Sequence, residues 1–169
     1  MELLLNGHFY NPTKGDLTFD EVTGEIIDYI AKKPEKFYDI IVGCDSSSER
    51  EPSFPVVVAI LRVGEGGRFF IKKIHYKNRL FFNYHQRVLE EVLLSIELAQ
   101  ALRATLDKKL KEITIPLDYQ FRYIHADVGE QGATRDMVKE IMGLIWGNGF
   151  EPKIKPEAYV ASVVADRYT

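Results

Sequence analysis

The alternation of apolar and polar positions divides the chain into helix-like and strand-like segments. Thr18 and Glu21 form a capping box ahead of apolar residues at helical spacing, which predicts a helix over residues 18–33. Short apolar runs bounded by turn residues predict strands elsewhere. The further predicted helices are 84–110, 134–147 and an apolar helix that ends at residue 169. The predicted strands are 39–45, 54–63, 68–77, 119–127 and 151–155.

The order of these elements predicts an α/β fold. One helix comes first, and a β-β-β-α-β-α-β-α order follows, which favours one mixed sheet with helices on its faces. The 169 residues suit a single domain. We expect residues 1–36 to form an N-terminal helical extension and residues 37–169 to form the α/β domain. Because the first helix has no partner in this sheet, we expect it to be a surface for homo-oligomerisation.

Composition narrows the class of protein. Hydrophobic residues make up 46% of the chain and aromatic residues 12%, which is enough for a packed core. The single cysteine, Cys44, forms no internal disulfide. The N-terminal sequence MELLLNG has no signal-peptide pattern, and the longest apolar run, 56–61, is far shorter than a membrane span. We therefore expect a cytoplasmic protein without a membrane partner.

The net charge of -3 conceals a basic segment between Gly66 and Leu89. This segment contains no acid, and aromatic residues alternate with its bases, a composition typical of single-stranded nucleic-acid binding. The alternative is that the aromatic residues belong to the core and the bases protect a sheet edge from aggregation. The bases expected to contact substrate are Lys72, Lys73, Lys77 and Arg79.

Two aspartates follow predicted strands directly. Asp45 ends the first strand and Asp127 ends the fourth. In α/β sheets, ligands bind beyond the carboxyl ends of the strands, and neighbouring strands lie about 5 Å apart. Two carboxylates that close repel each other unless a cation lies between them. The alternative is that each aspartate is an ordinary turn residue.

Two further acids extend this candidate site. On the helix 84–110, Glu91 lies at the edge of the apolar stripe, whereas Glu90 and Glu97 lie opposite and should be solvated. Asp166 lies in an apolar C-terminal stretch, where an acid needs a partner or a metal. Four carboxylates favour Mg²⁺ or Mn²⁺ over structural zinc. The alternative for Glu91 is an ordinary solvated glutamate on the helix surface. The alternative for Asp166 is an ion pair with its neighbour Arg167 or another base. His125 shares a strand face with Asp127. It either takes part in proton transfer or is a hydrogen-bonded residue of the core.

Three segments resemble the YkuK-like family of the ribonuclease H-like superfamily. They are GCDSS, HADVGEQGATRDMVKEIMG and the C-terminal GFEPKIKPEAYVASVVADRYT, and the resemblance covers residues 37–169. It implies a five-stranded mixed sheet whose second strand is antiparallel. It also implies four metal-binding and catalytic acids on the first strand, the long helix, the fourth strand and the last helix. They are Asp45, Glu91, Asp127 and Asp166. Glu90 replaces Glu91 in this set if the register of the helix shifts.

The superfamily resemblance implies a metal-dependent nuclease that acts on DNA or RNA. Two Mg²⁺ or Mn²⁺ ions about 3.5–4 Å apart would activate a water and stabilise the leaving oxygen. The loop 129–134 precedes a helix, and its backbone N–H groups are candidates for holding a phosphate. The alternative is a catalytically silent nucleic-acid-binding or oligomerisation module on the same fold.

Overall fold

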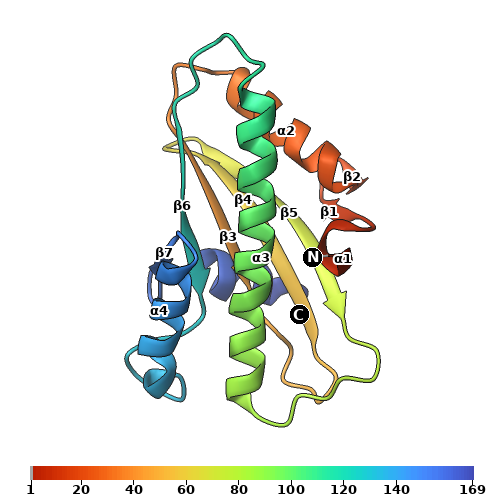
Figure 1. The fold of residues 1–169 in the computed structure, drawn as a ribbon, viewed down its shortest axis with the longest axis vertical. Helices are drawn as coiled ribbons and strands as arrows, with labels where there is room; N and C mark the ends of the chain where they lie inside the picture. The colour runs from red at the N-terminus through yellow and green to blue at the C-terminus, as the bar shows by residue number, and fades with distance from the viewer. Residues whose placement is uncertain (1) are drawn as a thin grey trace.

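A seven-stranded sheet forms the centre of the molecule in the computed structural model, which describes residues 2–169 (Figure 1). Helices α1 to α4 lie on one face of the sheet, and the short C-terminal helices lie on the other. The helices are α1 (Glu2–Leu5), α2 (Phe19–Ala31), α3 (Tyr84–Leu110), η1 (Arg135–Met137), α4 (Val138–Gly147), η2 (Val160–Ala165) and η3 (Asp166–Tyr168). The strands are β1 (Phe9–Asn11), β2 (Gly15–Leu17), β3 (Tyr38–Cys44), β4 (Ser53–Arg62), β5 (Gly66–His75), β6 (Tyr119–Ala126) and β7 (Glu151–Lys153).

The sheet is mixed, with strand order β2-β1-β5-β4-β3-β6-β7. β3 pairs in parallel with β6, and β6 pairs in parallel with β7. β4 runs antiparallel between β3 and β5, as the second strand of the domain was expected to do. The expected number of strands was wrong, because β1 and β2 add to the edge of the sheet through the pairing of Tyr10 with Ile71. Both are three residues long, too short for an alternating pattern to identify.

Helix α2 belongs to the main core of the molecule. The capping box is confirmed: the Thr18 hydroxyl accepts the Glu21 N–H, and Glu21 accepts the Thr18 N–H. The apolar face of α2 is buried in the core shared with α3, so the expectation that this helix lacks a partner was wrong. The reason for expecting oligomerisation through it is thereby removed. A separate unit of residues 1–36 stays a prediction.

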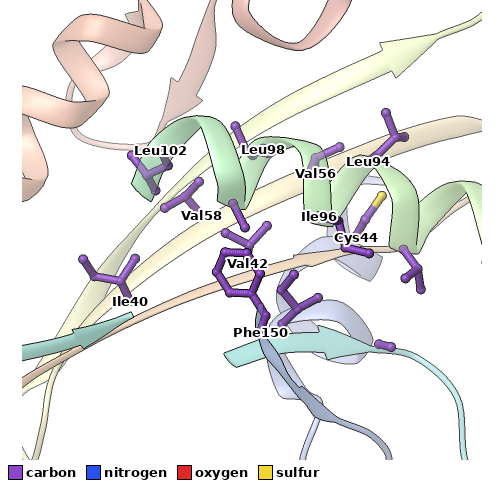
Figure 2. Packing of buried hydrophobic residues seen from close by; sticks show 14 of the residues in the cluster. Ile40, Val42, Cys44, Val56, Val58, Leu94, Ile96, Leu98, Leu102 and Phe150 are labelled. Atoms are coloured by element: carbon purple, nitrogen blue, oxygen red, sulfur yellow. The ribbon is translucent and has the colours of Figure 1, made fainter. Parts of the chain in front are cut away.

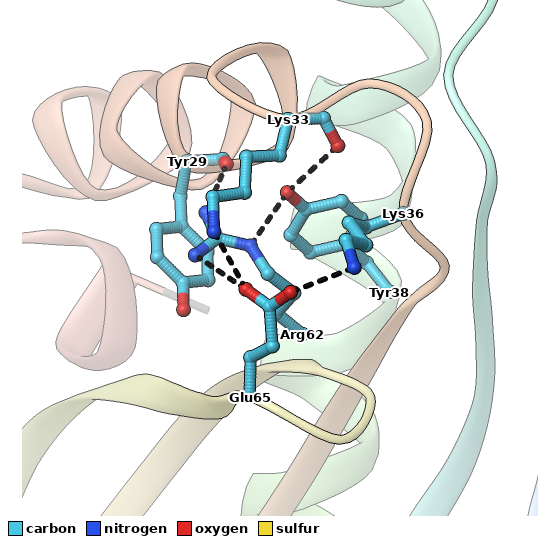
Figure 3. Close-up of polar contacts among 6 residues, drawn as sticks. All are labelled: Tyr29, Lys33, Lys36, Tyr38, Arg62 and Glu65. Atoms are coloured by element: carbon cyan, nitrogen blue, oxygen red, sulfur yellow. Dashed lines mark hydrogen bonds and ion pairs between the residues drawn. The ribbon is translucent and has the colours of Figure 1, made fainter.

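A polar cluster ties the end of α2 to the turn between β4 and β5 (Figure 3). Glu65 pairs with Lys33 and Lys36, each at 2.8 Å, and these contacts lower the pKa of Glu65 to about 2. Arg62 Nε donates to the Tyr38 hydroxyl at 2.9 Å, and this hydroxyl donates to the Lys33 carbonyl. The cluster lies at the amino end of β3, the end opposite Asp45. It therefore has a structural role, distant from the predicted acids.

The sheet is buried on both faces, which explains the continuous apolar runs of its central strands. Alternate residues of β3 point to opposite sides: Ile40 and Val42 face α3, whereas Ile41 contacts the core under the C-terminal helices. Figure 2 shows the α3 side of this packing. Cys44 lies within it, and burial raises the pKa of its thiol.

Two helical segments differ from the sequence prediction. Thr134 makes no side-chain cap, because its hydroxyl accepts the Gly129 N–H at 2.9 Å, and α4 begins only after the 3₁₀ turn η1. The C-terminal segment forms the π-helical η2 and the 3₁₀ turn η3 in place of an α-helix. Within residues 2–169, no helix combines the length and the apolar character that crossing a membrane requires.

Candidate active site

Asp45 lies one residue beyond the carboxyl end of β3. Its Oδ1 accepts the Ser46 backbone N–H at 2.8 Å, which fixes the direction of the carboxylate. Burial raises the pKa of Asp45 to about 6; the Ser46 bond opposes this shift, and the carboxylates of Asp127 and Asp166 add to it. Removal from water disfavours the charged carboxylate, and the nearby negative charges disfavour it further.

Glu91 reaches the same end of the sheet from α3. It is 4% exposed, and its Oε1 accepts a hydrogen bond of 2.5 Å from the Ser46 hydroxyl. Burial raises its pKa well above the ordinary range, the Ser46 bond opposes the shift, and Asp45 and Asp127 add to it. Ser46 thus connects the strand-end aspartate to the helix glutamate.

Glu90 points elsewhere, and its expected solvation was wrong. It is 8% exposed because the connection between β5 and α3 folds over it. Its carboxylate accepts from the Tyr76 hydroxyl and pairs with Arg79 at 2.7 Å. Of the two neighbouring glutamates, Glu91 is therefore the one that lies beside Asp45.

Asp127 follows β6, and the parallel register of β3 and β6 places it next to Asp45. Cys44 pairs with Ala126, so the two aspartates each come one residue after paired positions. Lys155 Nζ lies 3.2 Å from Asp127 Oδ1. This oxygen is buried and accepts no hydrogen bond of good geometry.

Asp166 comes from the opposite face of the sheet. η2 packs closely on β3 at Gly43, where an added Cβ would lie 3.0 Å from Ala161 N and 3.2 Å from Val160 Cγ1. A glycine on the strand and small residues on the helix therefore allow the close approach that brings Asp166 into the electrostatic range of Asp45. Asp166 itself is exposed.

The four acids are ligands of the type that a hard divalent cation prefers, but they do not form a complete metal centre. The four side chains offer carboxylate oxygens, the ligands that Mg²⁺ and Mn²⁺ prefer. The ammonium of Lys155 already lies beside Asp127, which shows that a positive charge is favoured there. Within residues 2–169, however, no three His, Cys, Asp or Glu side chains are arranged as a metal centre.

His125 is a core residue. It is buried, its Nδ1 accepts the Val160 backbone N–H at 3.2 Å, and its ring packs edge-on against Tyr159. Burial, followed by the charge of Lys153, lowers the pKa of His125 to about 4. A neutral imidazole whose Nδ1 is already occupied positions the start of η2, which favours the core interpretation over proton transfer.

The four bases expected to contact substrate do not form one surface. Lys72 and Lys73 are successive residues of β5, so their side chains point to opposite faces of the sheet. Lys72 is 7% exposed, and its ammonium contacts the Asn6 carbonyl and lies 5.5 Å from the Phe9 ring. Lys73 and Lys77 are exposed, whereas Arg79 pairs with Glu90. The N-terminal segment that covers Lys72 could not be foreseen from local composition.

Three side chains that lie beside the acids were not predicted from the sequence to belong to the site. Arg87 lies one helical turn before Glu91, opposes the burial that raises the pKa of that carboxyl, and donates to the Ser48 carbonyl at 3.3 Å. Tyr84 stacks under Arg87, and burial raises the pKa of its hydroxyl, as do Glu91, Asp127 and Asp45. The i, i+4 spacing of Arg87 and Glu91 could have indicated that these two side chains lie side by side on the helix. The third is Lys155, which only the end of β7 brings to Asp127.

Comparisons with known proteins agree with this arrangement. The sequence model of the Ribonuclease H-like family matches residues 21–169, a range that includes all four acids. The chain is also 31% identical over 170 residues to the Uncharacterized protein YkuK of Bacillus subtilis (strain 168), with 95% of this chain and 96% of that protein covered. No solved structure matches the chain.

Proposed function

Because the chain belongs to the ribonuclease H-like family, we propose that it is a divalent-metal-dependent nuclease that hydrolyses phosphodiester bonds in nucleic acid. One observation carries the proposal. Ser46 connects Asp45 to Glu91 through two hydrogen bonds, and the parallel register of β3 and β6 places Asp127 next to Asp45. Acids from three separate segments, Asp45, Glu91 and Asp127, therefore lie at the carboxyl end of β3, and the C-terminal segment that carries Asp166 packs on β3 at Gly43.

These residues have distinct roles in the proposed reaction. Asp45, Glu91, Asp127 and Asp166 would hold Mg²⁺ or Mn²⁺, and Ser46 orients the first two. When bound, the divalent ions supply Lewis acidity and a water of lowered pKa for attack on phosphorus. Arg87 and Tyr84 lie at the edge of the acids, where a guanidinium and an aromatic ring suit a phosphate and a base.

Isothermal titration with Mg²⁺ and Mn²⁺ tests the metal part of the proposal. We expect binding by the natural chain that is lost in Asp45→Asn and in Asp127→Asn. Asp118→Asn is the matched control, because Asp118 is an exposed aspartate just before the opposite end of β6. No binding by the natural chain at millimolar metal would falsify the metal site.

Cleavage assays test the reaction. Single-stranded and double-stranded DNA and RNA and a hybrid duplex are incubated with each divalent ion. We expect products that disappear in Asp45→Asn and persist in Asp118→Asn. Cleavage that survives in Asp45→Asn would trace the activity to a contaminant.

One observation favours a second candidate, a nucleic-acid-binding module without catalysis. The described residues, 2–169, contain no ready-made group of three metal ligands. This candidate predicts binding that weakens with salt, no cleavage with any divalent ion, and the same affinity for Asp45→Asn as for the natural chain.

A further inference from the structure

Lys155 forms an ion pair with one of the four acids. Its Nζ lies 3.2 Å from Asp127 Oδ1, and within residues 2–169 neither Asp45, Glu91 nor Asp166 has a corresponding base at ion-pair distance. Because Asp127 Oδ1 is buried and accepts no hydrogen bond, the ammonium is its compensating charge.

The backbone sets the position of this lysine. The Lys155 N–H donates to the Val128 carbonyl at 2.8 Å, so the chain after β7 is bound to the residue that follows Asp127. An added Cβ at Gly129 would lie 3.2 Å from Lys155 Cβ, so the glycine allows the lysine to pack closely. The ammonium is therefore placed beside Asp127 by its own main chain.

The other side of Lys155 is open. Its side chain is 47% exposed, and together with four other residues it lines a pocket of about 390 Å³ that includes part of the loop after Asp127. The remaining lining residues are Gly129, Glu130, Gln131 and Pro156. Because Lys155 both pairs with Asp127 and lines this pocket, its flexible four-carbon side chain can turn the ammonium from one to the other while the main chain stays fixed.

We infer that Lys155 is a tethered cation that holds Asp127 until a divalent cation binds there, and that it then turns to the pocket to bind a substrate phosphate. The inference rests on the proposed function. A divalent ion and an ammonium repel each other on the same carboxylate oxygen, so binding of the ion displaces the lysine. The displaced ammonium attracts an anion, and so metal binding and phosphate binding favour each other.

Titration with Mn²⁺, without nucleic acid, tests the competition. The full chain is compared with Lys155→Met, with Lys155→Gln as a second variant, and with the control Lys153→Met. Lys153 is also a half-exposed strand-end lysine, but its partner is Glu157. We expect the Lys155 variants to bind Mn²⁺ roughly two- to fivefold more tightly, since a partly exposed ion pair of this strength is removed, and Lys153→Met to match the natural chain.

A second titration tests the phosphate contact. A fluorescent single-stranded oligonucleotide is titrated with and without Ca²⁺. We expect Ca²⁺ to strengthen binding to the natural chain and to Lys153→Met, and to have less effect in Lys155→Met. An equal effect of Ca²⁺ in all three proteins overturns the role of the lysine in substrate binding.

The possible outcomes separate this inference from the proposed function. Equal or weaker Mn²⁺ binding by both Lys155 variants overturns the inference, and the proposed function stands if Asp127→Asn still abolishes binding. Mn²⁺ binding by the Lys155 variants alone overturns the inference as well, because the ion then never displaces the lysine in the natural chain. Absence of Mn²⁺ binding in every protein overturns both.

Discussion

The Ser46 hydroxyl donates a hydrogen bond of 2.5 Å to Glu91 Oε1, joining the end of β3 to the buried side of α3. Glu91 is almost fully enclosed, so this hydroxyl is an important source of stabilisation for its carboxylate. The residue after Asp45 therefore positions the glutamate, while its backbone N–H positions the aspartate.

Replacing Ser46 by alanine should destabilise the protein. The substitution leaves the Glu91 carboxylate without its hydroxyl donor, which costs about 1–3 kcal/mol in the free energy of unfolding. Urea unfolding at neutral pH measures the loss. Ser48→Ala is the control, because Ser48 is exposed nearby. Equal stability of the two variants would show that Glu91 does not depend on this bond.

Asp45→Asn should stabilise the protein at neutral pH when no divalent ion is present. The folded-state pKa of Asp45, about 6, lies above its ordinary 3.8. The stabilising effect of the protonated carboxyl is thus complete below about pH 4 and is lost as the pH rises through 6. Since Asp45 is partly exposed, the gain at pH 7.5 should be only about 1 kcal/mol.

Unfolding curves in EDTA at several pH values between about 4 and 8 check this prediction. The difference between Asp45→Asn and the natural chain should grow with pH and level off above 6. Asp118→Asn should show no such trend. A constant difference, or a destabilised Asp45→Asn at pH 7.5, contradicts the cause given for the pKa shift.

Divalent ions should stabilise the folded protein more at pH 7.5 than at pH 5. Ligand binding to the folded state raises the unfolding temperature, and metal binding requires deprotonated carboxylates. At pH 5, Asp45 is mostly protonated when no metal is bound. Thermal unfolding with and without millimolar Mg²⁺ tests this. An equal rise at both pH values would place the bound ions away from Asp45.

Gly43→Ala should loosen the C-terminal helices. The new methyl group would lie 3.0 Å from Ala161 N and 3.2 Å from Val160 Cγ1, so η2 must shift. We expect a loss of about 1–3 kcal/mol in unfolding free energy. In the control Gly24→Ala, on α2, the added methyl group has no neighbour within 4 Å, and a gain of up to about 1 kcal/mol is expected. Equal effects would refute the close packing.

Lys72 and Arg87 should differ in nucleic-acid binding. Lys72→Met should leave oligonucleotide affinity unchanged, because its ammonium is buried against the Asn6 carbonyl. Arg87→Gln should weaken binding at low salt and reduce the salt slope by about one. Fluorescence anisotropy over a range of salt concentrations measures both variants. A larger loss in Lys72→Met would mean that the N-terminal segment moves away on binding.

The sequence alone determined the features that depend on local spacing. The helical repeat predicted the bounds of α3, and the apolar run of β3 and the alternation of β6 placed Asp45 and Asp127 at the ends of their strands. The same repeat placed Glu91 and Glu90 on different sides of α3, because successive helix residues point about 100° apart, but it did not foresee that Glu90 is buried. Each of these signals lies within a few residues of the chain.

Only the tertiary structure decided which distant segments meet. The short strands β1 and β2 have little pattern of their own; β1 is held by its pairing to β5, and β2 by its pairing to β1. Lys72 is buried because α1 and β1 cover it, and Glu90 is buried because the β5–α3 connection folds over it. Lys155 reaches Asp127 through the parallel pairing of β6 and β7. Burial and ion pairing across the sheet arise from packing between segments far apart in sequence, which the local order of residues does not encode.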